Sequence, residues 1–166
     1  NPAKDSSVAL MQAAQRAGEQ VWVCTIADLS AAPVPGDPRQ GHGAWVVATP
    51  VNCEPWFELG DPQLLPLTAF PRVWMRKDPP VDAQFIYDTQ VLQLAQDAGV
   101  LVVNDPQGLR DANEKLFAQH FPQCCAPTMV ARSTTELKRF AAEHGKIVLK
   151  PLDGMGGRSI FLSAHG

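Results

Sequence analysis

The chain lacks any excess of basic residues. Its 14 Lys and Arg stand against 17 Asp and Glu, which leaves a formal net charge of -3 at pH 7. Nucleic acids and anionic membranes are bound through clustered positive charge, so this balance argues against both as partners. Long hydrophobic runs are also missing, because none approaches the roughly 20 apolar residues that span a bilayer. Residues 1–5 lack the apolar core of a signal peptide, and we expect a cytoplasmic protein.

Cysteine is scarce, with 4 residues in a chain of 166. They show no C-x-x-C spacing, and the adjacent Cys124 and Cys125 have no partner ligands nearby. We therefore expect reduced thiols and no metal-ligating residue. The 4 histidines are scattered along the sequence, which favours solvated or structural roles over catalytic ones.

Helix and strand patterns alternate along the chain, which is typical of an α/β protein. We predict helices over residues 6–17, 82–98, 106–119 and 134–144 and strands over residues 20–26, 44–51, 72–75, 100–103, 127–131, 146–150 and 160–162. The Pro- and Gly-rich stretch 30–43 predicts a loop, and residues 54–71 predict irregular structure at a sheet edge. A helix that opens the chain and leads into a strand implies an earlier strand, in the β-α-β order of a parallel sheet.

These patterns predict two domains. We expect residues 1–112 to form an N-terminal domain with a parallel, Rossmann-like sheet, and residues 113–166 to begin a second, α+β domain. The chain opens without an initiator methionine and stops just after the strand-like residues 160–162. We therefore expect a fragment of a longer protein, cut at both ends.

The most informative motif follows the apolar residues 147–149, where Lys150 leads into Gly154-Met155-Gly156-Gly157. Glycines let successive backbone N–H groups point into one concavity, and the lysine adds a mobile full charge. This combination suits the phosphates of a nucleoside triphosphate. The spacing differs from the Walker and Rossmann glycine motifs, because here the lysine precedes the glycines. A tight hairpin is the alternative interpretation of the same residues.

Two further strings place charge where a ligand could reach it. Arg76 follows a predicted parallel strand, at the edge where open α/β sheets bind ligands, and an arginine there can grip a carboxylate. The alternative is a surface ion pair between Arg76 and Asp78. Lys115 is a second candidate, although most lysines beside acids such as Asp111 and Glu114 are solvated helix partners.

Together the three strings resemble the bacterial glutathione synthetase family of ATP-grasp ligases. The resemblance is carried by residues 4–7, 75–80, 85–87, 104–117 and 149–157. It implies that residues 1–112 form the domain that precedes the ATP-grasp fold, and that residues 113–166 open the ATP-grasp domain. Family members join γ-glutamylcysteine to glycine with ATP and Mg²⁺ through an acyl phosphate, and a homo-oligomer is expected.

The resemblance also implies residue roles. Lys115 and Lys150 contact the nucleotide; Gly154, Met155, Gly156 and Gly157 form a flexible loop over its phosphates; and Arg76 meets the dipeptide. Arg76 and Lys150 are the expected catalytic residues. The Mg²⁺ ligands are expected beyond residue 166, so the fragment alone should be inactive. Two alternatives stay open: another ATP-grasp carboxylate-amine ligase, and a nucleotide-binding module that does not catalyse.

Overall fold

The structure is a computed structural model that describes residues 5–36, 41–54, 57–77, 80–154 and 156–164. It divides into two compact units, the first formed by residues 1–77 with 87–106 and the second by residues 78–86 with 107–166. No helix within the described ranges is long and apolar enough to cross a membrane.

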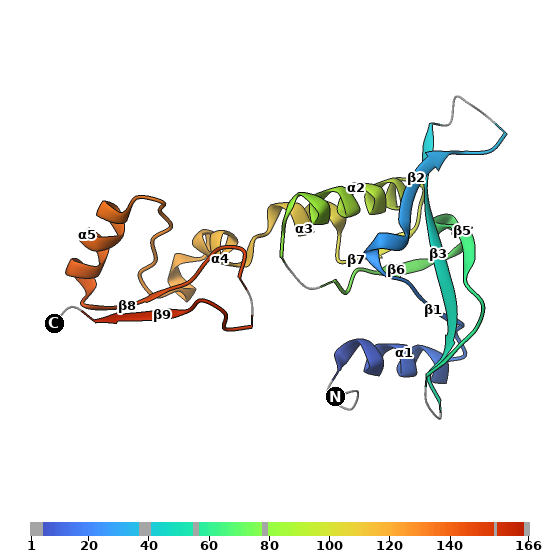
Figure 1. Cartoon of the computed structure of the whole chain (residues 1–166), viewed down its shortest axis with the longest axis horizontal. Helices are drawn as coiled ribbons and strands as arrows, with labels where there is room; N and C mark the ends of the chain where they lie inside the picture. Colours follow the sequence, from blue (N-terminus) through green and yellow to red (C-terminus); the bar gives the residue numbers. More distant parts are fainter. Residues whose placement is uncertain (1–4, 37–40, 55–56, 78–79, 155, 165–166) are drawn as a thin grey trace. The chain divides into compact units, whose positions relative to one another are not determined.

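The long strand β3 (His42–Asn52) organises the first unit (Figure 1). Four strands pair with it, all antiparallel: β1 (Val21–Val23), β2 (Leu29–Pro33), β4 (Glu58–Leu59) and β5 (Gln63–Pro66). Successive side chains of a strand point to opposite faces. Accordingly Ala44, Val46 and Ala48 are buried, with at most 5% of their surface exposed. One face of β3 therefore supplies much of the core of this unit.

The first unit also contains a parallel pair, β6 (Arg72–Trp74) and β7 (Leu101–Val103). The helix α2 (Ala83–Asp97) lies between them in the sequence, so the three elements form a β-α-β unit. Thr89, Leu92 and Ala95 are buried on α2 at the spacing of one helix face. This segment is the part of the chain that a parallel α/β pattern predicts.

The helix α1 (Ser6–Arg16) begins at Asp5, whose carboxylate accepts hydrogen bonds from the backbone N–H of Ser7 at 2.7 Å and of Val8 at 3.3 Å. These bonds hold the pKa of Asp5 below its ordinary value. At the other end of α1, the Gln15 amide donates to the Val51 carbonyl at 2.9 Å. The side-chain oxygen of Gln15 accepts from the backbone N–H of Cys53 at 2.7 Å. One glutamine thus joins α1 to the end of β3.

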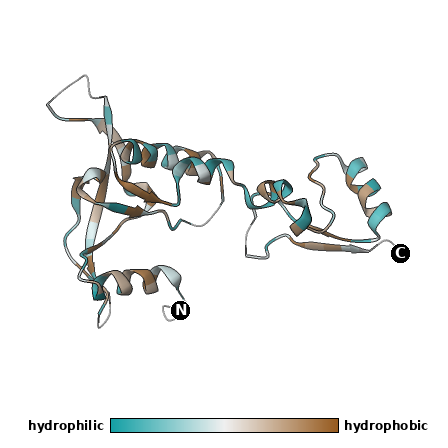
Figure 2. Cartoon of the chain, turned by 180° about the vertical axis from the view of Figure 1, so that it is seen from behind, coloured by the Kyte–Doolittle hydropathy of each residue, from teal (hydrophilic) through white to brown (hydrophobic). Residues whose placement is uncertain are grey.

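Short helices fill the second unit together with one hairpin. Its elements are α3 (Pro106–Asp111), which starts in the first unit, α4 (Glu114–Phe117), α5 (Thr134–His144), the strands β8 (Lys146–Leu149) and β9 (Phe161–Ala164), and the 3-10 turns η5 (Ala118–His120) and η6 (Pro122–Cys124). Among the described residues of the first unit, such turns are η2 (Ile26–Asp28) and η4 (Leu67–Ala69). Figure 2 shows a largely hydrophilic α5 beside the more hydrophobic β8 and β9.

Most helices and several strands agree with the sequence prediction. The helices α1, α2 and α5 are confirmed within two residues at each end, and Ser133 caps α5 by accepting from the Glu136 N–H at 3.4 Å. The strands β3, β6, β7 and β8 are confirmed. The chain is a mixed α/β protein, as predicted. A Rossmann-like sheet is not confirmed, because parallel pairing among the described residues is confined to β6 and β7.

Five local predictions differ from the structure. The predicted loop 30–43 contains most of β2 and the start of β3, and the irregular stretch 54–71 contains β4 and β5. Both missed pairings depend on β3, a partner that local composition does not reveal. Residues 127–131 form no strand, and the single helix predicted over 106–119 breaks between α3 and α4. The predicted buried strand 20–26 shrinks to β1, whose residues are half-buried.

We predict that Leu92→Ala lowers the free energy of unfolding by about 2–5 kcal/mol, because it leaves a cavity in the core. Leu92 is 1% exposed, whereas Leu64 is 65% exposed and offers a matched control. Urea unfolding followed by tryptophan fluorescence measures the change, since all 4 tryptophans lie in the first unit. Leu64→Ala should change the midpoint little; equal losses from both variants would contradict the assigned core.

Candidate functional site

A hollow of about 390 Å³ lies in the second unit, beside the connection between β8 and β9. Its lining comes from two stretches of sequence: Glu114 and Lys115 of α4, and Lys150, Pro151, Gly154, Gly157, Arg158 and Ile160 of the connection. Three of these side chains are cationic and one is acidic. The hollow therefore carries net positive charge, although the whole chain has a formal charge of -3. Such a site favours an anion.

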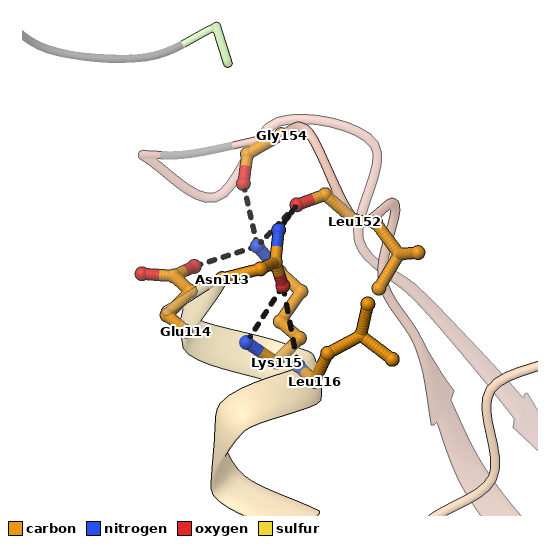
Figure 3. Close-up of polar contacts among 6 residues, drawn as sticks. All are labelled: Asn113, Glu114, Lys115, Leu116, Leu152 and Gly154. Carbon is orange, nitrogen blue, oxygen red and sulfur yellow. Dashed lines mark hydrogen bonds and ion pairs between the residues drawn. The ribbon is translucent and has the colours of Figure 1, made fainter. Parts of the chain in front are cut away.

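The start of α4 is hydrogen-bonded to the connection between β8 and β9, as Figure 3 shows. Asn113 caps α4, because its side-chain oxygen accepts from the backbone N–H of Lys115 at 3.0 Å and of Leu116 at 3.2 Å. The amide nitrogen of the same side chain donates to the Leu152 carbonyl at 3.2 Å. One asparagine therefore starts the helix and fixes the loop to it.

Lys115 makes three contacts through its ammonium group. It donates to the Gly154 carbonyl at 2.9 Å and to the Leu152 carbonyl at 3.3 Å, and it pairs with the Glu114 carboxylate at 2.6 Å. Only 19% of the Lys115 side chain is exposed, against 74% of Glu114. The Lys115 hydrogen bond and charge, with a smaller contribution from the charge of Lys150, hold the pKa of Glu114 below its ordinary value. We call Asn113, Lys115 and the two loop carbonyls the α4 clasp.

Lys150 and Arg158 complete the cationic wall of the hollow. Both are exposed, and neither forms a hydrogen bond or ion pair with another residue in the described parts of the chain. Lys150 follows β8 directly, so the strand fixes its backbone while the side chain keeps its freedom. These two side chains can meet an anionic ligand without first breaking a contact to a described residue.

The loop between the two strands has glycines for two different reasons. A Cβ on Gly154 would lie 2.5 Å from the Pro151 Cγ atom, so close packing requires glycine there. Gly156 and Gly157 have φ angles of 62° and 78°, which L side chains rarely adopt. Their backbone N–H groups donate to no residue that the structure describes. The loop therefore presents unused donors, as anion-binding backbone nests do.

Of the two predicted interpretations of this loop, the hairpin is confirmed in its strand pairing, and the phosphate loop stays a prediction. β8 and β9 are antiparallel, with Leu149 opposite Phe161, so the segment is a hairpin. However, the connection covers residues 150–160, which exceeds the roughly two to five residues of a tight hairpin loop. The extra length makes room for the hollow.

Arg76 lies in the first unit, just beyond β6. Its Nη2 donates to the Ser6 hydroxyl at 2.7 Å and its Nε to the Ser7 hydroxyl at 3.3 Å. Hydroxyl partners orient the guanidinium but do not neutralise it, so its charge stays available for a carboxylate. The alternative ion pair with Asp78 falls outside the described residues.

No group of three or more His, Cys, Asp or Glu in the described ranges could hold a metal ion. The hollow itself offers one carboxylate, Glu114, and Lys115 already occupies it. Mg²⁺ takes octahedral oxygen coordination, usually from one or two carboxylates together with waters and substrate phosphates. Because its one carboxylate is paired with Lys115, the described part of the hollow does not fit Mg²⁺, whereas its three cations suit an anion. The 4 cysteines are free thiols.

The structure brings together four of the predicted site residues, Lys115, Lys150, Gly154 and Gly157, around one hollow. Gly156 lies in the same loop, and Met155 falls outside the described residues. Lys115 is not the solvated helix partner of Asp111, which accepts instead from Gln107 at 2.6 Å. The sequence analysis missed Asn113 and Arg158. An N-cap residue directly before the Glu114-Lys115 pair was the available signal for Asn113.

Comparison with known families divides the chain in two. Residues 1–110 match the model described as the N-terminal domain of prokaryotic glutathione synthetase. Residues 114–166 match the model described as its ATP-grasp domain. The hollow and the α4 clasp lie almost entirely within the second match.

Individual relatives are similar over nearly the whole chain. The glutathione synthetase of Prochlorococcus marinus (strain MIT 9313) is 52% identical over 159 residues, which cover 96% of this chain and 49% of the relative. That of Xanthomonas axonopodis pv. citri (strain 306) is 51% identical over 99% of this chain and 51% of the relative. That of Yersinia pestis is 45% identical, with shares of 97% and 49%. The chain thus spans about half the length of these relatives.

We predict that Gly154→Ala loosens the loop, because the new Cβ would lie 2.5 Å from Pro151 and disturb the carbonyl that Lys115 binds. The free energy of local opening should fall by about 1–3 kcal/mol, the usual cost of overpacking. Hydrogen–deuterium exchange over residues 150–160 measures it. Gly60→Ala is a matched control in the first unit, where a Cβ would lie 2.7 Å from Pro50. Wild-type exchange in Gly154→Ala would refute the packing argument.

We also predict that the Glu114 carboxyl has a pKa below 4.5, which NMR titration of the side-chain carboxyl measures. Since the folded pKa is the lower one, the Glu114 contribution to stability is complete above pH 4.5 and is lost as the pH falls through the folded value. Lys115→Met should raise the Glu114 pKa more than Lys150→Met does. A larger effect of Lys150→Met would contradict the observed pairing.

Proposed function

The chain belongs to the prokaryotic glutathione synthetase family, and we propose that the protein containing it joins γ-glutamylcysteine to glycine with ATP. The observation that carries the proposal is the cationic hollow of the second unit. There Lys115 and Lys150, 35 positions apart in the numbering, face one glycine loop within the segment that matches an ATP-grasp domain.

The proposed reaction explains why the hollow offers cations and amides. A carboxylate is a poor acyl donor, so it first takes the γ-phosphoryl group of ATP and becomes an acyl phosphate, with ADP released. The glycine amine then attacks the acyl carbon, the amide bond forms, and phosphate leaves. Phosphoryl transfer needs positioning and charge stabilisation more than a protein nucleophile. Lysine ammonium groups and loop N–H groups supply both.

The roles of the residues follow from their positions. We propose that Lys150 and Lys115 bind the nucleotide phosphates and that Gly154, Met155, Gly156 and Gly157 form the loop that covers them. The unused N–H groups of Gly156 and Gly157 support this role. Arg158, which lines the same hollow, would add a third cation. A covering loop also has a chemical purpose, because an acyl phosphate hydrolyses readily in water.

We propose that Arg76 binds a carboxylate of the dipeptide. The two serine hydroxyls of α1 hold its guanidinium in one orientation without neutralising its charge themselves, which supports this role. Two parallel hydrogen bonds to one carboxylate are the geometry that favours arginine over lysine. Arg76 and Lys150 thus remain the proposed catalytic residues.

We also propose that the reaction uses Mg²⁺ and that the residues that bind this ion lie outside this chain. The described residues of the hollow do not provide them, so we place the ligands in the part of the relatives that this chain does not span. Mg²⁺, when bound, would neutralise charge on the phosphates. The chain alone is accordingly predicted to be inactive.

Several predictions from the sequence stay predictions. They are the division into domains 1–112 and 113–166, the cytoplasmic location, the homo-oligomer, and the absence of nucleic-acid and membrane partners. A Rossmann-like arrangement of the first domain is supported by the β6-α2-β7 unit alone. Another ATP-grasp ligase with a different acid and amine is the second candidate function, and a non-catalytic nucleotide-binding module is the third.

We predict that the complete protein releases ADP only when γ-glutamylcysteine and glycine are both present, and that Lys150→Ala lowers kcat/KM about 100-fold or more. Loss of one preorganised charge or donor at a reacting group has this magnitude. Lys146→Ala is the matched control, because Lys146 is exposed on β8, the strand that Lys150 follows, and does not line the hollow.

Each other outcome selects a different function. ADP release with other acids but not with γ-glutamylcysteine would favour another ATP-grasp ligase. ATP binding without turnover on any acid would favour the non-catalytic module. Equal activity of Lys150→Ala and Lys146→Ala would remove Lys150 from the proposed site.

A further inference from the structure

The side chain of Asn113 makes hydrogen bonds both within its own helix and to a distant loop. Its oxygen caps α4, and its NH₂ group reaches a carbonyl 39 residues along the chain, at Leu152. Most N-cap residues bond only to their own helix. Ser133, which caps α5 in the same unit, donates to no loop residue in the described parts of the chain and shows the ordinary case.

Lys115, unlike Asn113, must give up an existing contact in order to bind a ligand. An ammonium group has three N–H donors, and all three of Lys115 already have acceptors: Glu114, Leu152 and Gly154. A phosphate oxygen that binds Lys115 must therefore replace one of these acceptors. Asn113 does not line the hollow, so an anion that enters it need not replace the bond from Asn113 to Leu152.

We infer that Asn113 is a positioning residue for the proposed phosphate site: it holds Leu152 in place while Lys115 exchanges a loop carbonyl for phosphate. This inference rests on the proposed function. Because Asn113 lies outside the lining of the hollow, its role requires no contact with the nucleotide. It acts through the loop, because a fixed Leu152 limits how far Gly154 and the residues after it move when Lys115 releases them.

The test uses Asn113→Ser in the complete protein. Serine keeps an oxygen that caps α4 but removes the NH₂ donor to Leu152. We expect KM for ATP to rise about three- to tenfold, the range of one neutral hydrogen bond, with a smaller change in kcat. Asn113→Asp, which keeps the size and the capping oxygen but also lacks the donor, should raise KM as well.

A second readout needs no catalysis. Trypsin cleaves after arginine, and Arg158 is exposed in the loop. Without nucleotide, Asn113→Ser should be cut after Arg158 several times faster than the wild type, at an unchanged thermal midpoint. Ser133→Ala is the control, because it removes a cap in the same unit without touching the loop. It should lower the midpoint and leave both KM and the cleavage rate unchanged.

The outcomes separate the two proposals. Wild-type KM together with a wild-type cleavage rate in Asn113→Ser would overturn the positioning role. An equal rise of KM in Ser133→Ala would also overturn it, because the effect would then be one of general stability. If the wild type formed no ADP, the proposed function would fail, and the cleavage rate alone would still decide whether Asn113 holds the loop.

Discussion

The site depends on the hydrogen bonds between α4 and the carbonyls of Leu152 and Gly154. Charge-assisted bonds of this kind are stronger than neutral ones, and the Lys115 side chain that makes them is largely shielded from water. They bring a short helix against a loop that lies far away in the sequence. These hydrogen bonds hold Lys115 at the hollow that Lys150 also lines. The positive charge of the hollow thus depends on the hydrogen-bonded contact between α4 and the loop.

The loop combines fixed and adaptable parts. The strand pairing of Leu149 with Phe161 fixes its ends, and α4 fixes Leu152 and Gly154. Gly156 and Gly157 lie beyond these anchors; their φ angles are positive, and their N–H groups donate to no described residue. A phosphate-binding loop needs this division, because donors must be preorganised yet able to adjust as a ligand enters.

How much of this could be read from the sequence depended on how local each feature is. Helix caps and apolar periodicity lie within a few residues, so α1, α2 and α5 were predicted well. β2 and β5 end in prolines and lack apolar alternation, and only pairing with β3 makes them strands. The break before α4 was missed because Asn113 was treated as helix interior, although asparagine favours caps. The residue types of the site were identifiable, but the two loop carbonyls that Lys115 binds were not, since they lie 37 and 39 residues away.

The charge balance of the hollow also limits what this chain can contribute to catalysis. A nucleotide triphosphate with a bound divalent cation needs both positive groups around its phosphates and carboxylates around the metal. The described hollow offers three cations and one carboxylate, and that carboxylate is paired with Lys115 at 2.6 Å. To release Glu114 for a metal would leave Lys115 held by carbonyls alone and weaken the clasp. The two demands therefore conflict at Glu114, which is a physical reason to place the metal ligands in another part of the protein.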